Sequence, residues 1–251
     1  MTKDFVILTG AYGGLGKALA YQYAKNGYGL ILLGRKEASL KTLQKDLSKH
    51  TTIYPIVCDV SNWESCQNAQ KLIDELQVSV KVLINNAGIT YIQNFNQDYE
   101  IEQYKKLIET NLNGAVYLSR LFMNDLIENK GSIINISSVI GFAPVLGRTA
   151  YAASKFGLEG FFSVLQAEMN DQLHIMMVYP TFIATHIRDG LGVETNKYKV
   201  LTAENVASSV LKAHQQKKKK VYIGRTAKIS YYLYKFFPKL YVNLMKKNVE
   251  S

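Results

Sequence analysis

Residues 5–16, FVILTGAYGGLG, join a short apolar run to a glycine-rich turn. The run has the composition of a strand buried on both faces, and glycines let the backbone of a turn approach a bound anion closely. A helical pattern follows over residues 15–26, and a helix N-terminus attracts negative charge. A phosphate-binding turn is therefore one interpretation of this stretch, and an ordinary tight turn is the other.

Similar apolar runs alternate with helical patterns along the rest of the chain. Strands are expected at residues 5–10, 29–34, 53–60, 82–86, 132–137, 175–180 and 221–224. Helices are expected at residues 15–26, 37–49, 61–76, 99–129, 150–170 and 203–215. Strict alternation over 251 residues predicts a single Rossmann-type α/β domain. We expect a doubly wound, seven-stranded parallel sheet in the order 3-2-1-4-5-6-7, with helices on both faces.

A second informative stretch is residues 138–155, SVIGFAPVLGRTAYAASK. Tyr151 and Lys155 are four positions apart, which places them on one face of a helix. An ammonium so close to a phenol lowers the pKa of the phenol. Ser138 follows a predicted strand, so its hydroxyl could reach the same carbonyl oxygen as Tyr151. An isolated pair of this kind is more often part of a surface helix.

Four motifs occur together in a fixed order: TGAYGGLG at 9–16, NNAG at 85–88, Asn111, and Ser138 with Tyr151 and Lys155. In these motifs and their distances the chain resembles the classical short-chain dehydrogenase/reductase family over residues 4–225. The resemblance implies an oxidoreductase that transfers a hydride between a nicotinamide cofactor and a carbonyl or secondary alcohol.

The resemblance also implies a role for each of four catalytic residues. Tyr151 is expected to donate a proton to the carbonyl oxygen, and Ser138 a hydrogen bond to the same atom. Lys155 is expected to lower the pKa of Tyr151 and to hold the nicotinamide ribose. Asn111 is expected to hold a water that relays protons to Lys155. No metal is required, and the scattered histidines and two cysteines, Cys58 and Cys66, offer no metal-binding pattern.

The end of the second predicted strand bears on cofactor preference. NAD-dependent relatives usually carry an acid there, whereas this chain has Gly34 followed by Arg35. A guanidinium can pair with a 2′-phosphate, so NADP(H) is favoured over NAD(H). Tyr12 and Gly13 stand where NADP-linked relatives often have a second basic residue.

Further cofactor contacts are implied by the family pattern. They are Thr9, Gly10, Tyr12, Gly14, Leu15, Gly16, Arg35, Asp59, Val60, Asn86, Ala87, Gly88, Tyr151, Lys155, Pro180 and Thr185. Asp59 with Val60 would contact the adenine ring, although Asp59 could instead cap the next helix. Thr181 replaces the glycine that relatives usually have after Pro180.

The substrate is expected to bind between residues 141–149 and 182–198. These stretches are largely apolar, which favours a hydrophobic or lipid-like ketone. Arg148, His186 and Arg188 could meet an anionic group, or they could be solvated loop residues.

The net charge of +10 is confined to one segment. Residues 217–247 contain nine lysines, Arg225 and no acid, whereas the rest of the chain has 20 basic and 20 acidic residues. We expect a catalytic domain at 1–225 and a basic amphipathic tail at 226–251, kinked or restarted as a second helix at Pro238. The tail could contact a membrane peripherally, cover the substrate pocket or pack against a second subunit. Nucleic acid is not an expected partner.

Other functional classes remain as alternatives. A non-catalytic NADP(H)-binding sensor would have no need of the intact Asn111, Ser138, Tyr151 and Lys155 set. A nucleotide-sugar epimerase or dehydratase would need more room for a substrate domain. We expect a cytoplasmic homo-oligomer, a dimer or tetramer, at the membrane surface if the tail binds lipid. No signal peptide is expected, and both cysteines are expected to be reduced packing residues.

Overall fold

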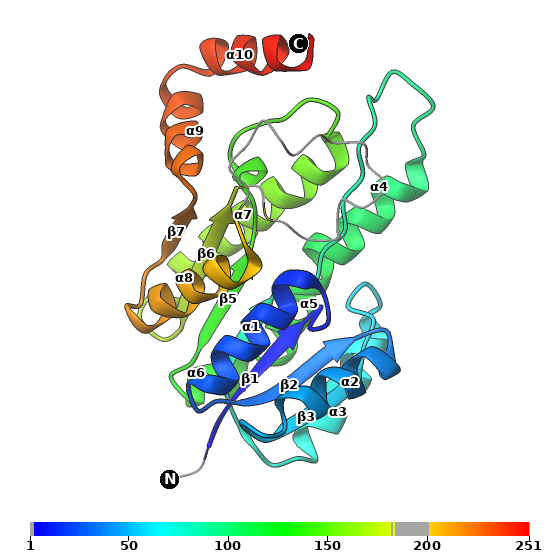
Figure 1. Ribbon diagram of the computed structural model, residues 1–251, viewed down its shortest axis with the longest axis vertical. Helices are drawn as coiled ribbons and strands as arrows, with labels where there is room; N and C mark the ends of the chain where they lie inside the picture. The colour runs from blue at the N-terminus through cyan, green and yellow to red at the C-terminus, as the bar shows by residue number, and fades with distance from the viewer. Residues whose placement is uncertain (1–2, 182, 184–200, 251) are drawn as a thin grey trace.

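A single parallel sheet organises the computed structural model, which describes residues 3–181, 183 and 201–250. Its strands are β1 (Asp4–Thr9), β2 (Gly29–Gly34), β3 (Ile53–Val57), β4 (Ser79–Asn85), β5 (Ser132–Ile136), β6 (His174–Pro180) and β7 (Lys220–Ile223). They lie in the order β3-β2-β1-β4-β5-β6-β7 (Figure 1). The predicted doubly wound sheet is therefore confirmed.

Helices cover both faces of this sheet. They are α1 (Gly14–Lys25), α2 (Glu37–Leu47), α3 (Trp63–Asp74), α4 (Ile101–Ile108), α5 (Gly114–Leu121), α6 (Met123–Glu128), α7 (Thr149–Met169) and α8 (Ala203–Gln215). Side chains of β1 show the two layers, because Val6 and Leu8 pack with residues of α1, α2 and α8. Phe5 and Ile7 point to the other face, where they pack with residues of α3, α5 and α7.

The helix predicted over residues 99–129 is wrong as one continuous element. Helix α4 ends at Ile108, a π-helical turn runs over Glu109–Asn113, and α5 and α6 follow. A π turn contains one more residue than an α turn and changes the direction of the side chains that it carries. The buried side chain of Asn111 lies in this turn, so the irregularity positions a residue of the predicted site.

The basic tail forms two helices, α9 (Arg225–Phe236) and α10 (Pro238–Glu250). A second helix therefore begins at Pro238, which was one of the two predicted outcomes; the other was a kink in one helix. In Figure 1, α9 rises from the end of β7 and α10 turns across above it, far from the N-terminus. Both helices lie toward the carboxyl ends of the strands, where ligands bind in sheets of this kind.

Candidate active site

A cleft of about 400 Å³ opens at the carboxyl ends of the strands. Most of the predicted site residues line it: Gly10, Tyr12, Gly14, Leu15, Gly16, Arg35, Asp59, Val60, Asn86, Ala87, Gly88, Ser138, Tyr151, Lys155 and Pro180. Two predicted residues, Thr9 and Asn111, instead line a smaller cavity next to this cleft. Thr185, His186 and Arg188 lie outside the described residues.

The turn between β1 and α1 has the geometry of an anion cradle. Gly10 has a φ of +60°, and an added Cβ would lie 2.9 Å from the Cα of Ala87. A Cβ on Gly16 would lie 2.2 Å from the carbonyl oxygen of Gly10. Helix α1 begins at Gly14 without a side-chain cap on its first amides. Uncapped amides at a helix N-terminus are suited to a pyrophosphate, so the turn fits a dinucleotide.

Thr9 and Asn86 hold this turn against the end of β4. The Oγ1 of Thr9 accepts hydrogen bonds from the backbone amides of Asn86 and Ala87, each at 2.9 Å. In return, the Nδ2 of Asn86 donates to the carbonyl oxygens of Thr9 at 2.9 Å and Gly10 at 3.2 Å. Thr9 is buried, so the structure gives it a supporting position behind the cleft.

The end of β2 lacks an acid for a steric reason. An added Cβ on Gly34 would lie 2.5 Å from the Cε1 of Tyr12, so the tyrosine ring occupies the space of a side chain there. Arg35 follows as an exposed residue that lines the cleft. This end of the cleft therefore presents a guanidinium where NAD-dependent relatives usually present a carboxylate.

Asp59 follows β3 and lines the same part of the cleft. Its Oδ1 accepts hydrogen bonds from the Ser61 amide at 3.1 Å and the Ser61 hydroxyl at 2.7 Å. The alternative that Asp59 caps the next helix is wrong, because Asn62 caps α3 by accepting from the Ser65 amide at 2.7 Å. Asp59 thus closes a local turn, and Val60 beside it is buried against the cleft.

Tyr151 and Lys155 share one face of α7, as predicted from their spacing. The Nζ of Lys155 lies 5.8 Å from the centre of the Tyr151 ring and donates a 2.9 Å hydrogen bond to the carbonyl oxygen of Ile136. Burial lowers the pKa of Lys155 to about 8. The amine therefore titrates close to physiological pH beside a phenol that lines the cleft.

Ser138 enters the cleft from the end of β5. It precedes the 3₁₀ turn Val139–Gly141, and its Oγ accepts from the amide of Ile140 at 3.2 Å. That bond fixes the direction of the oxygen and leaves the hydroxyl hydrogen as a donor. Ser138, Tyr151 and Lys155 thus bring a hydroxyl, a phenol and an amine to one cleft.

Asn111 joins three segments behind this group. Its Oδ1 accepts from the amide of Ile89 at 2.8 Å, and its Nδ2 donates to the carbonyl oxygen of Ile89 at 2.9 Å. The same Nδ2 donates to the buried Oγ of Ser154 at 3.1 Å. Asn111 and Lys155 border the smaller cavity of about 10 Å³, which approaches the size that one water needs.

Apolar side chains make up much of the lining of the cleft. Lining residues that the sequence did not single out are Ile89, Thr90, Thr110, Ile136, Ser137, Val139 and Ile140. Several of these residues directly follow a motif in the sequence, and that position could have been used to predict that they line the cleft. Val145 and Ile183, which also line the cleft, belong to the stretches expected to bind the substrate. Arg148 also lines the cleft and is buried, with its Nη1 donating to the Thr90 Oγ1 at 2.6 Å. The interpretation of Arg148 as a solvated loop residue is therefore wrong.

Thr181 is accommodated by a glycine that directly follows the neighbouring strand β7. Its amide donates to the carbonyl oxygen of Ile223 at 3.0 Å. A Cβ on Gly224, which has a φ of +105°, would lie 2.3 Å from the Oγ1 of Thr181. The loss of the usual glycine after Pro180 is thus matched by Gly224, which lies between β7 and α9.

Fold and cleft together define a dinucleotide-binding protein of the doubly wound class. A family model described as short chain dehydrogenase matches residues 4–196. "Dehydrogenase/reductase SDR family member 7B" of Xenopus laevis is 33% identical over 265 residues, covering 98% of this chain and 82% of that protein. The chain belongs to the short-chain dehydrogenase family, whose members are NAD(P)-dependent oxidoreductases.

Solved structures extend the likeness of the fold. A short chain dehydrogenase from Burkholderia cenocepacia in complex with NADP has a TM-score of 0.84 at 22% identity, with 97% of both chains covered. A short chain dehydrogenase/reductase from Burkholderia phymatum in complex with NAD has a TM-score of 0.84 at 20% identity, with 95% of both chains covered. Both nicotinamide dinucleotides thus occur among structures with this fold.

Within residues 3–181, 183 and 201–250, no group of three or more His, Cys, Asp or Glu side chains could hold a metal ion. None of the helices in those ranges has the length and apolar content needed to cross a bilayer.

Proposed function

We propose that this protein is an NADP(H)-dependent oxidoreductase that interconverts a hydrophobic or lipid-like ketone and the corresponding secondary alcohol. The observation that carries the proposal is the meeting of Ser138, Tyr151 and Lys155 in the cleft that also holds the glycine turn. Apolar side chains make up much of the lining of that cleft, which favours a substrate with an apolar body.

Each polar group has a task in carbonyl reduction. Tyr151 donates its proton to the carbonyl oxygen, and Ser138 stabilises the negative charge that develops there. Lys155, when protonated, favours ionisation of Tyr151 and binds the ribose next to the nicotinamide. The bound nicotinamide supplies or accepts the hydride. The chain's own residues thus handle the proton and the charge.

Asn111 completes the proton path in this proposal. The small cavity between Asn111 and Lys155 suits a single water, and such a water would return a proton to Lys155. The side-chain amide is committed to Ile89 and Ser154, so Asn111 also fixes the walls of that cavity.

Preference for NADP(H) rests on the end of β2. Tyr12 fills the space beside Gly34 and Arg35 lines the cleft next to it. A guanidinium can pair with the 2′-phosphate of NADP(H), whereas NAD(H) offers it only a hydroxyl.

The tail is proposed to contact a membrane surface from the cytoplasm. Large side chains are exposed on α9, on α10 and at the residue between them: Ile229, Tyr232, Phe236, Phe237, Leu240 and Leu244. Lysines surround them, which suits anionic lipid. A symmetric contact between two copies through this face would set lysines against lysines, so lipid is the better partner.

Replacement of Tyr151 by phenylalanine tests the proposed chemistry. The change removes one hydroxyl and keeps the ring, so NADPH affinity should stay as in the wild type. Turnover of a ketone should fall by roughly 100-fold or more, since general acid catalysis contributes 10²–10⁴-fold. Steady-state kinetics and NADPH titration measure both quantities. Wild-type turnover in Tyr151→Phe would refute the assignment.

A further inference from the structure

The loop that follows Ser138 is packed on its inner side against α7. Gly141 permits this contact, because an added Cβ would lie 2.6 Å from the Oγ of Ser137 and 3.1 Å from the carbonyl oxygen of Lys155. The amide of Gly141 also donates to the carbonyl oxygen of Ser138 at 2.9 Å. The position of Ser138 therefore depends on what holds this short turn in place.

On its outer side the loop is held by one aromatic ring, that of Phe142. Three tyrosine rings surround Phe142 edge-on: Tyr179 of β6 at 5.2 Å, Tyr222 of β7 at 5.7 Å and Tyr231 of α9 at 5.2 Å. The angles between ring planes are 67°, 67° and 86°, the favourable edge-to-face arrangement. Phe142 thus ties the loop to two strands and to the first helix of the tail.

The tyrosines are themselves fixed to the body of the domain. Tyr179 and Tyr222 stack at 5.1 Å, and Tyr231 lies 5.2 Å from Tyr222. The hydroxyl of Tyr179 donates to Glu159 of α7, and Glu159 forms an ion pair with Lys220 at 2.5 Å. The rings therefore form a connected cluster between the catalytic helix and the tail.

We propose that α9 is part of the catalytic unit and that Tyr231 is a positioning residue, acting through Phe142 on the loop that presents Ser138. This inference rests on the proposed function of Ser138. The catalytic domain would then extend to the end of α9 and not stop at residue 225, as the sequence predicted. Because the neighbouring Tyr232 is exposed on the proposed lipid-facing side, the same helix links that surface to the catalytic loop.

The test compares Tyr231→Ala with Tyr232→Ala in the full chain. The two tyrosines are adjacent in α9, but only Tyr231 is in ring contact with Phe142. Tyr231→Ala should lower kcat by roughly 10–100-fold, since small displacements of catalytic groups have effects of that size. NADPH affinity should stay unchanged, because Tyr231 does not line the cofactor cleft. Tyr231→Phe should restore kcat, and Tyr232→Ala should leave it unchanged.

Hydrogen exchange of the segment 137–146 gives a second readout that does not depend on turnover. Tyr231→Ala should speed exchange in this segment, and Tyr232→Ala should not. If the wild type reduces no carbonyl, the proposed function fails while exchange still tests the coupling. Wild-type kcat and exchange in Tyr231→Ala, or equal losses in both variants, would overturn the inference.

Discussion

At the scale of single residues, Tyr12 and Gly34 depend on each other. A side chain on Gly34 would collide with the Tyr12 ring, so the chain cannot carry an acid at the end of β2 without moving that ring. The cofactor end of the cleft then depends on Arg35 for its charge, with Asp59 as the only described acid that lines the cleft.

Replacement of Arg35 by glutamine removes this charge and keeps most of the side-chain length. NADPH affinity should fall by roughly 10- to 100-fold, because a charged hydrogen bond contributes about 1.5–3 kcal/mol. NADH affinity should change little, since its ribose carries no phosphate. Fluorescence titration with both cofactors measures the ratio. Equal losses for NADPH and NADH would contradict the proposed preference.

At the scale of elements, a buried hydrogen-bond chain connects β5, β6, α8 and α1 away from the cleft. His174 Nε2 lies 3.0 Å from the carbonyl oxygen of Lys218, so that nitrogen carries the proton, and Nδ1 accepts from Ser132 Oγ at 3.1 Å. His214 Nε2 then donates to Ser132 at 3.1 Å, and its Nδ1 accepts from Tyr23 at 3.2 Å. Both imidazoles are therefore neutral in this arrangement.

These two buried histidines predict how the stability of the protein depends on pH. Burial lowers the pKa of His214 to about 4, with help from the charge of Lys217 and, once it is protonated at low pH, of His174. Burial also lowers the pKa of His174. The unfolded chain takes up these protons as the pH falls through about 6.5. The free energy of unfolding should therefore decrease by about 1.4 kcal/mol per pH unit for His214 between those values.

Urea unfolding between pH 7.5 and 4.5 measures this slope. His214→Gln should flatten it, whereas the change His50→Gln, at an exposed position, should preserve it. Equal slopes in the wild type and His214→Gln would contradict the role given to this buried imidazole.

Two helical glycines predict opposite outcomes when changed to alanine. A Cβ on Gly16 would lie 2.2 Å from the Gly10 oxygen, so Gly16→Ala should cost about 1–3 kcal/mol of stability and weaken NADPH binding. Gly160 in α7 has nothing within 4 Å of its added Cβ, so Gly160→Ala should stabilise by about 0.5–1 kcal/mol. Thermal unfolding and NADPH titration distinguish them, and a loss in both variants would refute this account of the turn.

The strands and most helices could be predicted because their apolar runs report burial directly. The π-helical turn could not, since the reason for it is the pairing of Asn111 with the distant backbone of Ile89. The burial of Arg148 was missed for the same reason, because its partner Thr90 lies on another loop. Motifs identify residue types at fixed spacing, whereas pairings between loops appear only in three dimensions.

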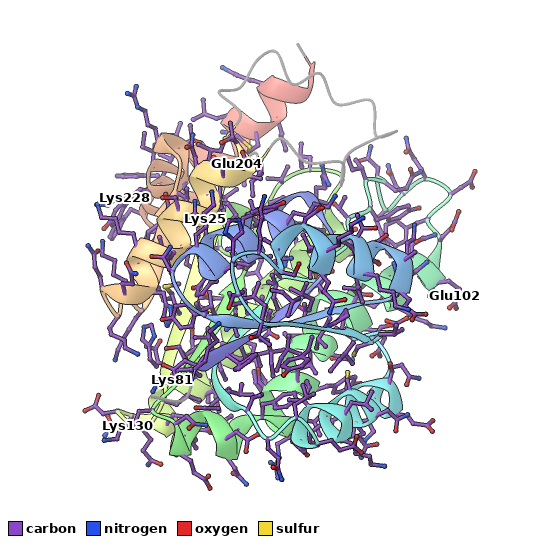
Figure 2. The ribbon with its side chains drawn as sticks, turned by 60° about the horizontal axis from the view of Figure 1, so that its bottom comes forward. Lys25, Lys81, Glu102, Lys130, Glu204 and Lys228 are labelled. Carbon is purple, nitrogen blue, oxygen red and sulfur yellow. The ribbon has the colours of Figure 1, made fainter. Side chains whose placement is uncertain are left out.

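At the scale of the whole molecule, the excess positive charge lies in residues 217–247, at the end of the domain and in the tail, whereas the rest of the chain has as many acidic as basic residues. Figure 2 shows Lys228 on the tail and Lys130 on a different part of the surface. Vesicles containing phosphatidylserine should bind the protein more tightly than phosphatidylcholine alone, and salt should weaken binding. Lys228→Glu should reduce affinity, because each basic residue near the surface contributes about 1 kcal/mol.

Lys130→Glu makes the same change in charge away from the tail and should leave vesicle binding unchanged. Equal effects of both changes would indicate a general charge effect. The membrane proposal would be contradicted if the wild-type protein did not bind vesicles and instead formed dimers that dissociate in the variant Phe236→Ser. That result would show that α9 and α10 pack against a second copy of the chain.

The central claim is that the cleft reduces a ketone with NADPH by means of Tyr151. NADPH consumption should therefore be followed with a series of ketones of increasing apolar length, using the wild-type protein and NADH as the competing cofactor. The account predicts NADPH-dependent turnover whose kcat/KM rises with apolar length. Tight NADPH binding without turnover on any ketone in the series would contradict it.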